Sequence, residues 1–379
     1  LYKYIITDEI WGLSRKELFY KDTFSCPGLV SLGGKPFVDI RMSFNSLTPA
    51  SLDDEVSSKL IDFYIQKLQK NPHLHDKVEF DVVLNVFDFN LDKKLSDISH
   101  IFSESEIIQI KKSLREQTSK IIKKESNTIE NEYKKLSLLK ERREEIKSKD
   151  MPILTKVKRL LDDCKTYGTL PFSKLARCAF ISTSFLKSML DNQFIDKDDY
   201  DFFFSSIATV SDAFIKDLAR LSSNDLDMSQ FIAIYGHLRP GTYDITSPSY
   251  KDAIHDFIDL KNIKLSDKKH TNFSLDTDKI RRISKEIQSS ELDFDYKTLM
   301  TFMKNSIELR EYAKFEFSKN LSLVLDLIKE WGAQKVLPPY SVSFLTIEKI
   351  LSYSNKSTSS NLRSELDNDI SYKQTEFVA

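Results

Sequence analysis

Glycine is scarce in this chain, and this scarcity constrains the fold more than any other feature of the sequence. Only 8 of the 379 residues are Gly, against a usual share of about 7%. Doubly wound sheets and nucleotide-binding domains need glycine-rich loops that let the backbone approach phosphate groups, and none of their glycine patterns occurs here. The sequence therefore argues against a nucleotide-binding α/β domain and favours a chain built mainly from helices.

The charged residues are balanced, which limits the classes of partner that the chain attracts. Lys and Arg number 56, and Asp and Glu number 57. Such a balance gives no general attraction to nucleic acid or to an anionic membrane, so any anion site must be local. No apolar run approaches the ~18 residues of a membrane span, and no signal peptide is visible. We therefore expect neither nucleic acid nor membrane as a partner.

The three cysteines, Cys26, Cys164 and Cys178, are scattered and odd in number. This pattern does not fit a disulfide framework, and it favours a reducing, cytoplasmic compartment. No Cys-x-x-Cys pair or Cys–His pair has the spacing of a structural metal site. His73 and His75 could share a metal, but no carboxylate or Cys completes their set, so we expect no bound metal. The chain begins at Leu1 within a hydrophobic pattern, which favours a segment of a longer protein.

Residues 1–102 predict a small α/β subregion. Apolar and polar residues alternate at 37–45, and residues 78–91 are rich in Val and Phe, so both segments are typical of strands. Helical spacing lies between them, at 49–68. A small antiparallel sheet with helices on one side fits this order.

The rest of the chain predicts helices. Residues 103–150 are rich in Lys and Glu and begin with a Ser103–Glu106 capping pattern, which predicts a long exposed helix or a helical hairpin. Residues 151–352 show helical spacing in segment after segment. The Ser- and Asn-rich composition of residues 353–379 predicts a linker. The predicted fold class is thus α+β and predominantly helical: a small antiparallel sheet near the N-terminus, then a multi-helix domain.

The densest functional signal is the segment YGHLRPGTYDITSPSY at 235–250. Gly236 is expected to end one helix in the left-handed conformation, and Pro240 begins a tight turn. The next helix is expected to start at Ser249, with Asp252 completing a capping pair.

Five side chains of this short loop suit an anion and amide site. Arg239 offers a planar fork for carboxylate or phosphate, and His237 exchanges protons near neutral pH. Asp244 can orient the histidine or accept a proton, and Thr242 and Tyr243 add hydroxyls. A plain helix–helix connection with internal hydrogen bonds explains the same residues equally well.

Two other groups could meet this loop. The polar face of the 37–45 segment carries Arg41, Ser43 and Asn45, which on its own also fits a solvated sheet surface. Arg310 and Lys314 are four residues apart on one helical face and repel each other unless an anion lies between them. A simple pairing with Glu311 is the alternative.

Several segments resemble the middle region of the phosphoenolpyruvate-synthase-like phosphotransferases. They are IITDEIWGLSRKELFY, PFVDIRMSFNSLTP, LHDKVEFDVV, YGHLRPGTYDI and LREYAKFEF. The YGHLRPGTYDI segment is similar to a motif of rifampicin phosphotransferases, but it carries Leu238 before the arginine and Thr242 where Glu is often found. The greater similarity is to L-glutamine kinases of capsular phosphoramidate biosynthesis, which phosphorylate the side-chain amide nitrogen.

This resemblance implies an acceptor-binding domain within a larger kinase. In that family an ATP-grasp domain, using ATP and Mg²⁺, phosphorylates a histidine on a swivelling domain, which delivers the phosphoryl group to the acceptor. The chain lacks the motifs of both partner domains, so we expect it to be inactive alone and to bind no cofactor itself. The implied acceptor is L-glutamine.

The resemblance also implies roles for the residues named above. His237 and Asp244 are the candidate catalytic bases, and Arg239 is the expected chief anion clamp. The expected substrate-binding residues are Arg239, Thr242, Tyr243, Arg41, Ser43, Asn45, Arg310 and Lys314. Two alternatives stay open: a related phosphotransferase with another acceptor, such as an antibiotic, and a non-catalytic helical interaction module.

Overall fold

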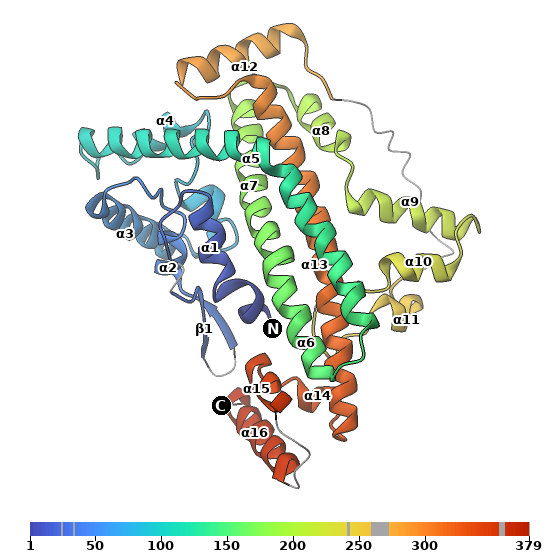
Figure 1. Cartoon of the computed structure of the whole chain (residues 1–379). Coiled ribbons are helices and arrows are strands. Elements are labelled where there is room, and N and C mark those ends of the chain that lie inside the picture. The colour runs from blue at the N-terminus through green and yellow to red at the C-terminus, as the bar shows by residue number, and fades with distance from the viewer. Residues whose placement is uncertain (24–25, 33–34, 241–242, 259–272, 356–360, 379) are drawn as a thin grey trace.

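Three long helices form the centre of the fold: α5 (Glu104–Ser148), α7 (Leu170–Asp191) and α13 (Tyr296–Gln334). They lie side by side in the computed structural model, with smaller helices on both sides (Figure 1). The structure describes residues 1–378 except 24–25, 33–34, 241–242, 259–272 and 356–360. The described chain is a predominantly helical α+β fold with a small antiparallel sheet near the N-terminus, which confirms the predicted fold class.

Around this centre the short elements form three groups. Those of the N-terminal region are η1 (Lys3–Thr7), α1 (Ile10–Glu17), α2 (Ile40–Asn45), α3 (Asp54–Lys70), η2 (Pro72–Leu74), η3 (Val78–Val82) and α4 (Leu91–Ser96). On the opposite side lie α8 (Lys197–Ser206), α9 (Val210–Ser222), α10 (Met228–Tyr235) and α11 (Tyr250–Phe257), with α12 (Thr277–Ser289) at one end (Figure 1). The other end holds α14 (Pro339–Val342), α15 (Ile347–Ser352), η5 (Tyr353–Asn355) and α16 (Asn361–Val378). None of the described helices is long and apolar enough to cross a membrane.

A close approach of two backbones fixes the centre. Helix α6 (Ile153–Cys164) continues through a π-helical turn, η4 (Lys165–Thr169), into α7. At Gly168 in this turn, an added Cβ would lie 2.8 Å from Cβ of Phe317 on α13. Such a contact is too short for any side chain, so glycine is what lets these helices pack so closely.

Helix α5 is one continuous helix rather than a hairpin, and its start is held by the predicted Ser103–Glu106 capping box. Many of its sparse apolar residues are buried, so the helix is less exposed than the sequence predicted. Ile110 and Leu114 belong to the core shared with the N-terminal region. Leu136 and Leu139 pack further along, near α13.

The sheet is smaller than expected and lies earlier in the chain. Strands β1 (Leu29–Leu32) and β2 (Lys35–Val38) pair antiparallel, with Leu29 opposite Val38. The predicted strand at 37–45 is wrong beyond Val38, because Asp39 caps a helix: its carboxylate accepts a hydrogen bond of 2.9 Å from the Met42 N–H. A cap signal at this position outweighs the alternation that follows it.

The predicted strand at 78–91 is also wrong. Residues 78–82 form the π-helical turn η3, and the chain then runs on without a strand partner. Its buried backbone groups bond to side chains instead. The Leu84 N–H donates to the Tyr64 hydroxyl at 2.9 Å, and the Phe87 N–H donates to Oγ1 of Thr118 at 2.9 Å. These bonds satisfy the buried backbone without a sheet.

The predicted linker at the C-terminal end contains a helix, α16, that packs against the rest of the chain. Leu366 is fully buried and Ile370 is nearly so, in the same core as Trp331 of α13. The carboxylate of Asp369 accepts a hydrogen bond of 2.5 Å from the Tyr353 hydroxyl and pairs with Lys349 at 2.9 Å. The composition of the segment suggests a linker, but Leu366 and Ile370 are four residues apart and share the buried face of the helix.

We expect Leu366→Ala to loosen this end of the molecule. Removing a fully buried leucine side chain typically costs about 2–5 kcal/mol. Urea unfolding should therefore show reduced stability, and limited proteolysis should cut the 356–378 region faster. Tyr372→Ala removes a side chain that is 69% exposed and is the control. Equal protease resistance of the two variants would show that α16 is not docked.

Candidate functional site

The loop between α10 and α11 is held in one shape by its ends. Helix α10 ends at Tyr235 as predicted, but Gly236 has an ordinary right-handed conformation, with φ of −59°, so the expected left-handed cap is wrong. Glycine is required there for a different reason: an added Cβ would lie 2.4 Å from the Ile232 carbonyl oxygen. The predicted Ser249–Asp252 capping box at the start of α11 is present.

Backbone hydrogen bonds then close the loop onto itself. The Tyr250 N–H donates to the Leu238 carbonyl at 2.9 Å, and the Lys251 N–H donates to the Gly236 carbonyl at 3.0 Å. The start of α11 is thereby fastened to the end of α10. The described residues next to these bonds, among them His237 and Arg239, lie on a backbone that is held at both ends of the loop.

Arg239 fastens the loop to α13. Its guanidinium is buried and pairs with Asp326 at 2.6 Å. It also donates to the Ser322 hydroxyl at 3.3 Å and to the Ser247 carbonyl. The expected role as anion clamp stays a prediction, and a ligand anion would have to compete with these internal partners.

His237 packs on Phe315 of α13, with ring centroids 4.7 Å apart. Burial, reinforced by the positive charges of Lys319 and Arg143, lowers the pKa of His237 to about 3, while backbone carbonyls of Ile234 and Phe315 oppose the shift. The ring is therefore neutral at neutral pH. Its Nε2 atom is buried and makes no hydrogen bond within the described part of the chain.

The remaining loop residues have separate surroundings. Asp244 accepts hydrogen bonds from the N–H and the hydroxyl of Thr246, at 2.7 and 2.5 Å, so it stabilises its own turn. It lines a cavity with Leu1 and Tyr2, away from His237. Tyr243 points toward α13, and burial raises its pKa. Thr242 lies outside the described residues.

A cavity of about 320 Å³ lies between this loop, α9 and α13, and we call it the aromatic cavity. It is lined by Val210, Ser211, Phe214, Ile215, Leu238, Tyr243, Tyr250, Glu311, Lys314, Phe315 and Ser318. Two predicted substrate residues, Tyr243 and Lys314, thus meet in one place. Lys314 makes no ion pair with any described residue, whereas Glu311 pairs with Arg310 at 2.9 Å.

The structure does not bring the 41–45 segment to this cavity. Arg41, Ser43 and Asn45 lie on α2, on the opposite side of the central helices from α10 and α11 (Figure 1). Arg41 is exposed and pairs with Asp62 of α3 at 2.7 Å. The expectation that this face meets the 235–250 loop is therefore wrong, because the segment is a helix in the N-terminal region.

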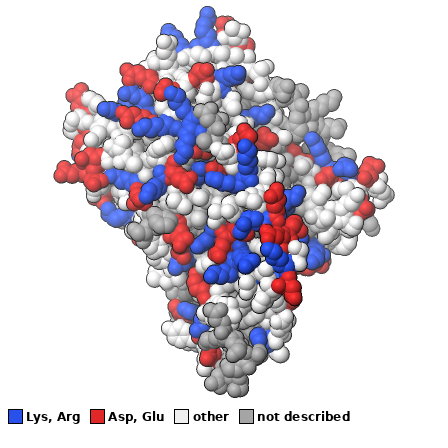
Figure 2. Space-filling model, in the orientation of Figure 1, with Lys and Arg blue, Asp and Glu red and all other residues white. Residues whose placement is uncertain are grey.

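A second cavity, of about 530 Å³, lies on the His237 side of the loop, and we call it the basic cavity. It is lined by Lys140, Arg143, Glu144, Lys147, Ile232, Ala233, Ile234, Gly236, His237, Lys251, Lys319, Ser322, Leu323 and Asp326. Charges of both signs are mixed over the face shown in Figure 2, so an excess of cations in one cavity is a local feature. Lys140, Arg143, Glu144 and Lys147 are absent from the predicted site, although they have the spacing of a single helical face.

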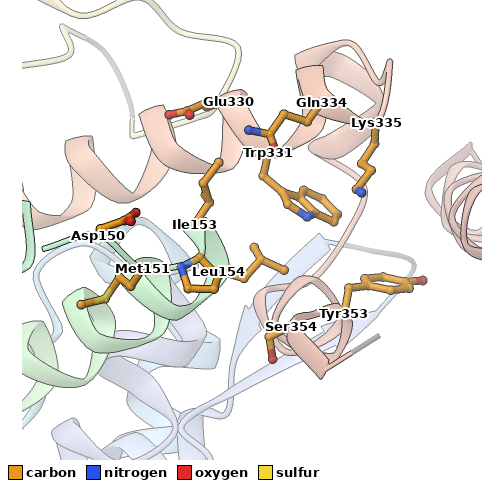
Figure 3. A pocket seen from close by; sticks show the side chains of 11 residues that line it. Asp150, Met151, Ile153, Leu154, Glu330, Trp331, Gln334, Lys335, Tyr353 and Ser354 are labelled. Atoms are coloured by element: carbon orange, nitrogen blue, oxygen red, sulfur yellow. The ribbon is translucent and has the colours of Figure 1, made fainter. Parts of the chain in front are cut away.

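A third cavity, of about 620 Å³, lies between α6, the end of α13 and η5 (Figure 3). Trp331 and Tyr353 are prominent in its walls, and their rings stack with centroids 6.1 Å apart. None of the predicted site residues lines it. No sequence motif marks this cavity, because its walls come from segments far apart in the chain.

Within the described residues, no group of three or more His, Cys, Asp or Glu side chains could hold a metal ion. In comparisons with protein-family models, curated proteins and solved structures, no match to this chain was found. The site must therefore be interpreted from its own geometry.

We expect Arg239→Lys to destabilise the fold. A lysine cannot copy the three directed hydrogen bonds of the guanidinium. Breaking a buried pair typically costs about 3–5 kcal/mol, and we expect ~2–3 kcal/mol here because Asp326 is 39% exposed. Urea unfolding of Arg239→Lys, Asp326→Asn and the double variant measures the coupling between the two residues. Fully additive effects would contradict the pairing.

The low pKa of His237 predicts a loss of stability in weak acid. Below about pH 6.5 the unfolded chain binds a proton at this ring and the folded chain does not, so the free energy of unfolding falls as pH falls toward 3. At ~1.4 kcal/mol per pH unit, the loss between pH 6.5 and 5 is about 2 kcal/mol. His237→Gln should remove this part of the pH dependence in urea unfolding. His73→Gln, at an exposed histidine, should leave it unchanged.

Proposed function

We propose that this chain is the acceptor-binding part of a phosphotransferase that works through a phosphohistidine on another domain, and that the acceptor is L-glutamine. The observation that carries the proposal is the aromatic cavity, in which Lys314 has no ion-pair partner among the described residues. The loop that closes this cavity carries the YGHLRPGTYDI segment, which resembles the acceptor region of such enzymes. ATP and Mg²⁺ would act on a separate ATP-grasp domain.

The aromatic cavity suits a free amino acid in size and in charge. Its volume of about 320 Å³ lies at the small end of ligand sites. Lys314 and Glu311 offer charges of opposite sign one helical turn apart, which matches the carboxylate and ammonium groups of a zwitterion. The rings of Phe214, Tyr243 and Tyr250 would surround the side chain, and hydroxyls would be left for its amide.

Transfer to the amide breaks the phosphorus–nitrogen bond of the phosphohistidine and forms a new one to the glutamine nitrogen. The amide proton must leave to a base, because an amide nitrogen is a poor nucleophile. His237 and Asp244 stay the candidates. The pKa of His237, about 3, keeps the ring unprotonated as a base requires, but it also makes the ring a weak base until a nearby negative charge raises that pKa.

Calorimetry of this chain against L-glutamine tests the proposal. We expect Lys314→Ala to weaken glutamine binding about tenfold or more, since hydrogen bonds to charged groups contribute roughly 1.5–3 kcal/mol. Lys304→Ala, at an exposed lysine of α13 that does not line the cavity, is the control. L-Glutamate, L-asparagine, D-glutamine, pyruvate and rifampicin complete the ligand panel.

Absence of glutamine binding, or equal binding by both lysine variants, would sink the proposal. Tight binding of rifampicin or pyruvate in place of glutamine would favour a related phosphotransferase with another acceptor. No binding of any of these ligands would favour a helical interaction module.

A further inference from the structure

The basic cavity has a charge excess that its own residues do not neutralise. Five cationic residues line it, against two carboxylates, Glu144 and Asp326. Both carboxylates already have partners: Glu144 pairs with Lys147 at 2.8 Å, and Asp326 pairs with Arg239 at 2.6 Å. Lys140 and Lys251, from α5 and α11, make no ion pair with any described residue.

The inner wall of the basic cavity is held in place by ion pairs and hydrogen bonds between α5 and α13. Arg143 is buried and pairs with Glu316 of α13 at 3.2 Å, and Lys319 pairs with the same carboxylate at 2.6 Å. Asn320 holds the Arg143 guanidinium through a further bond of 2.9 Å. Arg143 also lies 3.7 Å from Glu144, so two carboxylates, Glu316 and Glu144, face three cations, Arg143, Lys147 and Lys319. One positive charge is left uncompensated at this wall.

His237 supplies a polar atom without a partner at the same wall. Its Nε2 atom is buried, and the described residues offer it no hydrogen bond. Buried polar atoms are normally bonded, so an unsatisfied one at a cavity wall indicates a group that binds there. The cations around it indicate that this group is an anion.

We propose that the basic cavity binds the phosphate group of a small molecule, with Lys140, Lys251 and Lys319 around its oxygens and with Nε2 of His237, which takes up a proton as the anion binds, donating to one of them. A phosphate dianion offers several acceptor oxygens to cations that converge from three helices, which a single carboxylate does not. The site lies across the His237–Phe315 contact from the aromatic cavity. The proposed phosphate site does not depend on glutamine being the acceptor.

Titration with inorganic phosphate at constant ionic strength, followed by calorimetry and by ³¹P NMR, tests the site. We expect the double variant Lys140→Ala/Lys251→Ala to bind phosphate at least tenfold more weakly than the unmodified chain. Both lysines are exposed, so the variant should keep its fold. Lys112→Ala, at an exposed lysine of α5 outside the cavity, is the matched control and should bind normally.

The His237 ring gives a second readout. If phosphate lies against Nε2, saturating phosphate should move the ring's NMR signal in the unmodified chain and raise its pKa, and the double variant should lose this response at the same phosphate concentration. No phosphate binding, or equal weakening by Lys112→Ala, would overturn the proposal. Glutamine binding measured on the same proteins keeps the two sites apart: phosphate binding without glutamine binding removes the proposed acceptor and leaves this site.

Discussion

The pair between Arg143 of α5 and Glu316 of α13 is the interaction on which the rest of the structure depends. Both residues are buried, and a buried pair is tolerated only when its remaining polar atoms are bonded. Asn320 and Lys319 supply these bonds from the next turn of α13. This network joins the two longest helices and forms the inner wall of the basic cavity, so the same contacts serve packing and charge.

Helix α13 serves both cavities through two faces of one rigid element. Glu311, Lys314, Phe315 and Ser318 face the aromatic cavity. Lys319, Ser322, Leu323 and Asp326 face the basic cavity with the same spacing, eight residues later. Eight residues of α-helix amount to about 12 Å along the axis and a rotation of roughly 80°. The two sites are therefore fixed relative to each other by helix geometry rather than by loops.

A feature could be predicted from the sequence when the residues that determine it are close together in the chain. The capping boxes at Ser103 and Ser249 depend on side chains three residues away and were predicted correctly. The strand at 78–91 was predicted wrongly, because its backbone groups bond to Tyr64 and Thr118, which no local pattern reveals.

In the candidate site, too, local features were predicted correctly and long-range contacts were not. The 235–250 loop was identified from its own residues, and Tyr243 and Lys314 do meet. Arg41 was placed near the loop on the strength of a strand that is a helix. The cations of α5 were interpreted as solvated, because which face of a helix meets another element depends on tertiary packing.

Arg239 and His237 show two ways in which this loop accommodates a side chain that can carry a charge away from water. A buried guanidinium is always charged, so it must be paired in the folded protein, and Asp326, Ser322 and Ser247 complete its bonds. A buried imidazole can avoid the cost of burying a charge by losing its proton. The low pKa of His237 shows that this ring is neutral in the folded protein. The neutral ring can then keep one nitrogen unbonded at a smaller cost than a charged group would incur. Backbone carbonyls of Ile234 and Phe315 bond to the His237 ring, and Arg239 holds the backbone two residues away, so the ring is positioned while its Nε2 atom makes no hydrogen bond to a described residue.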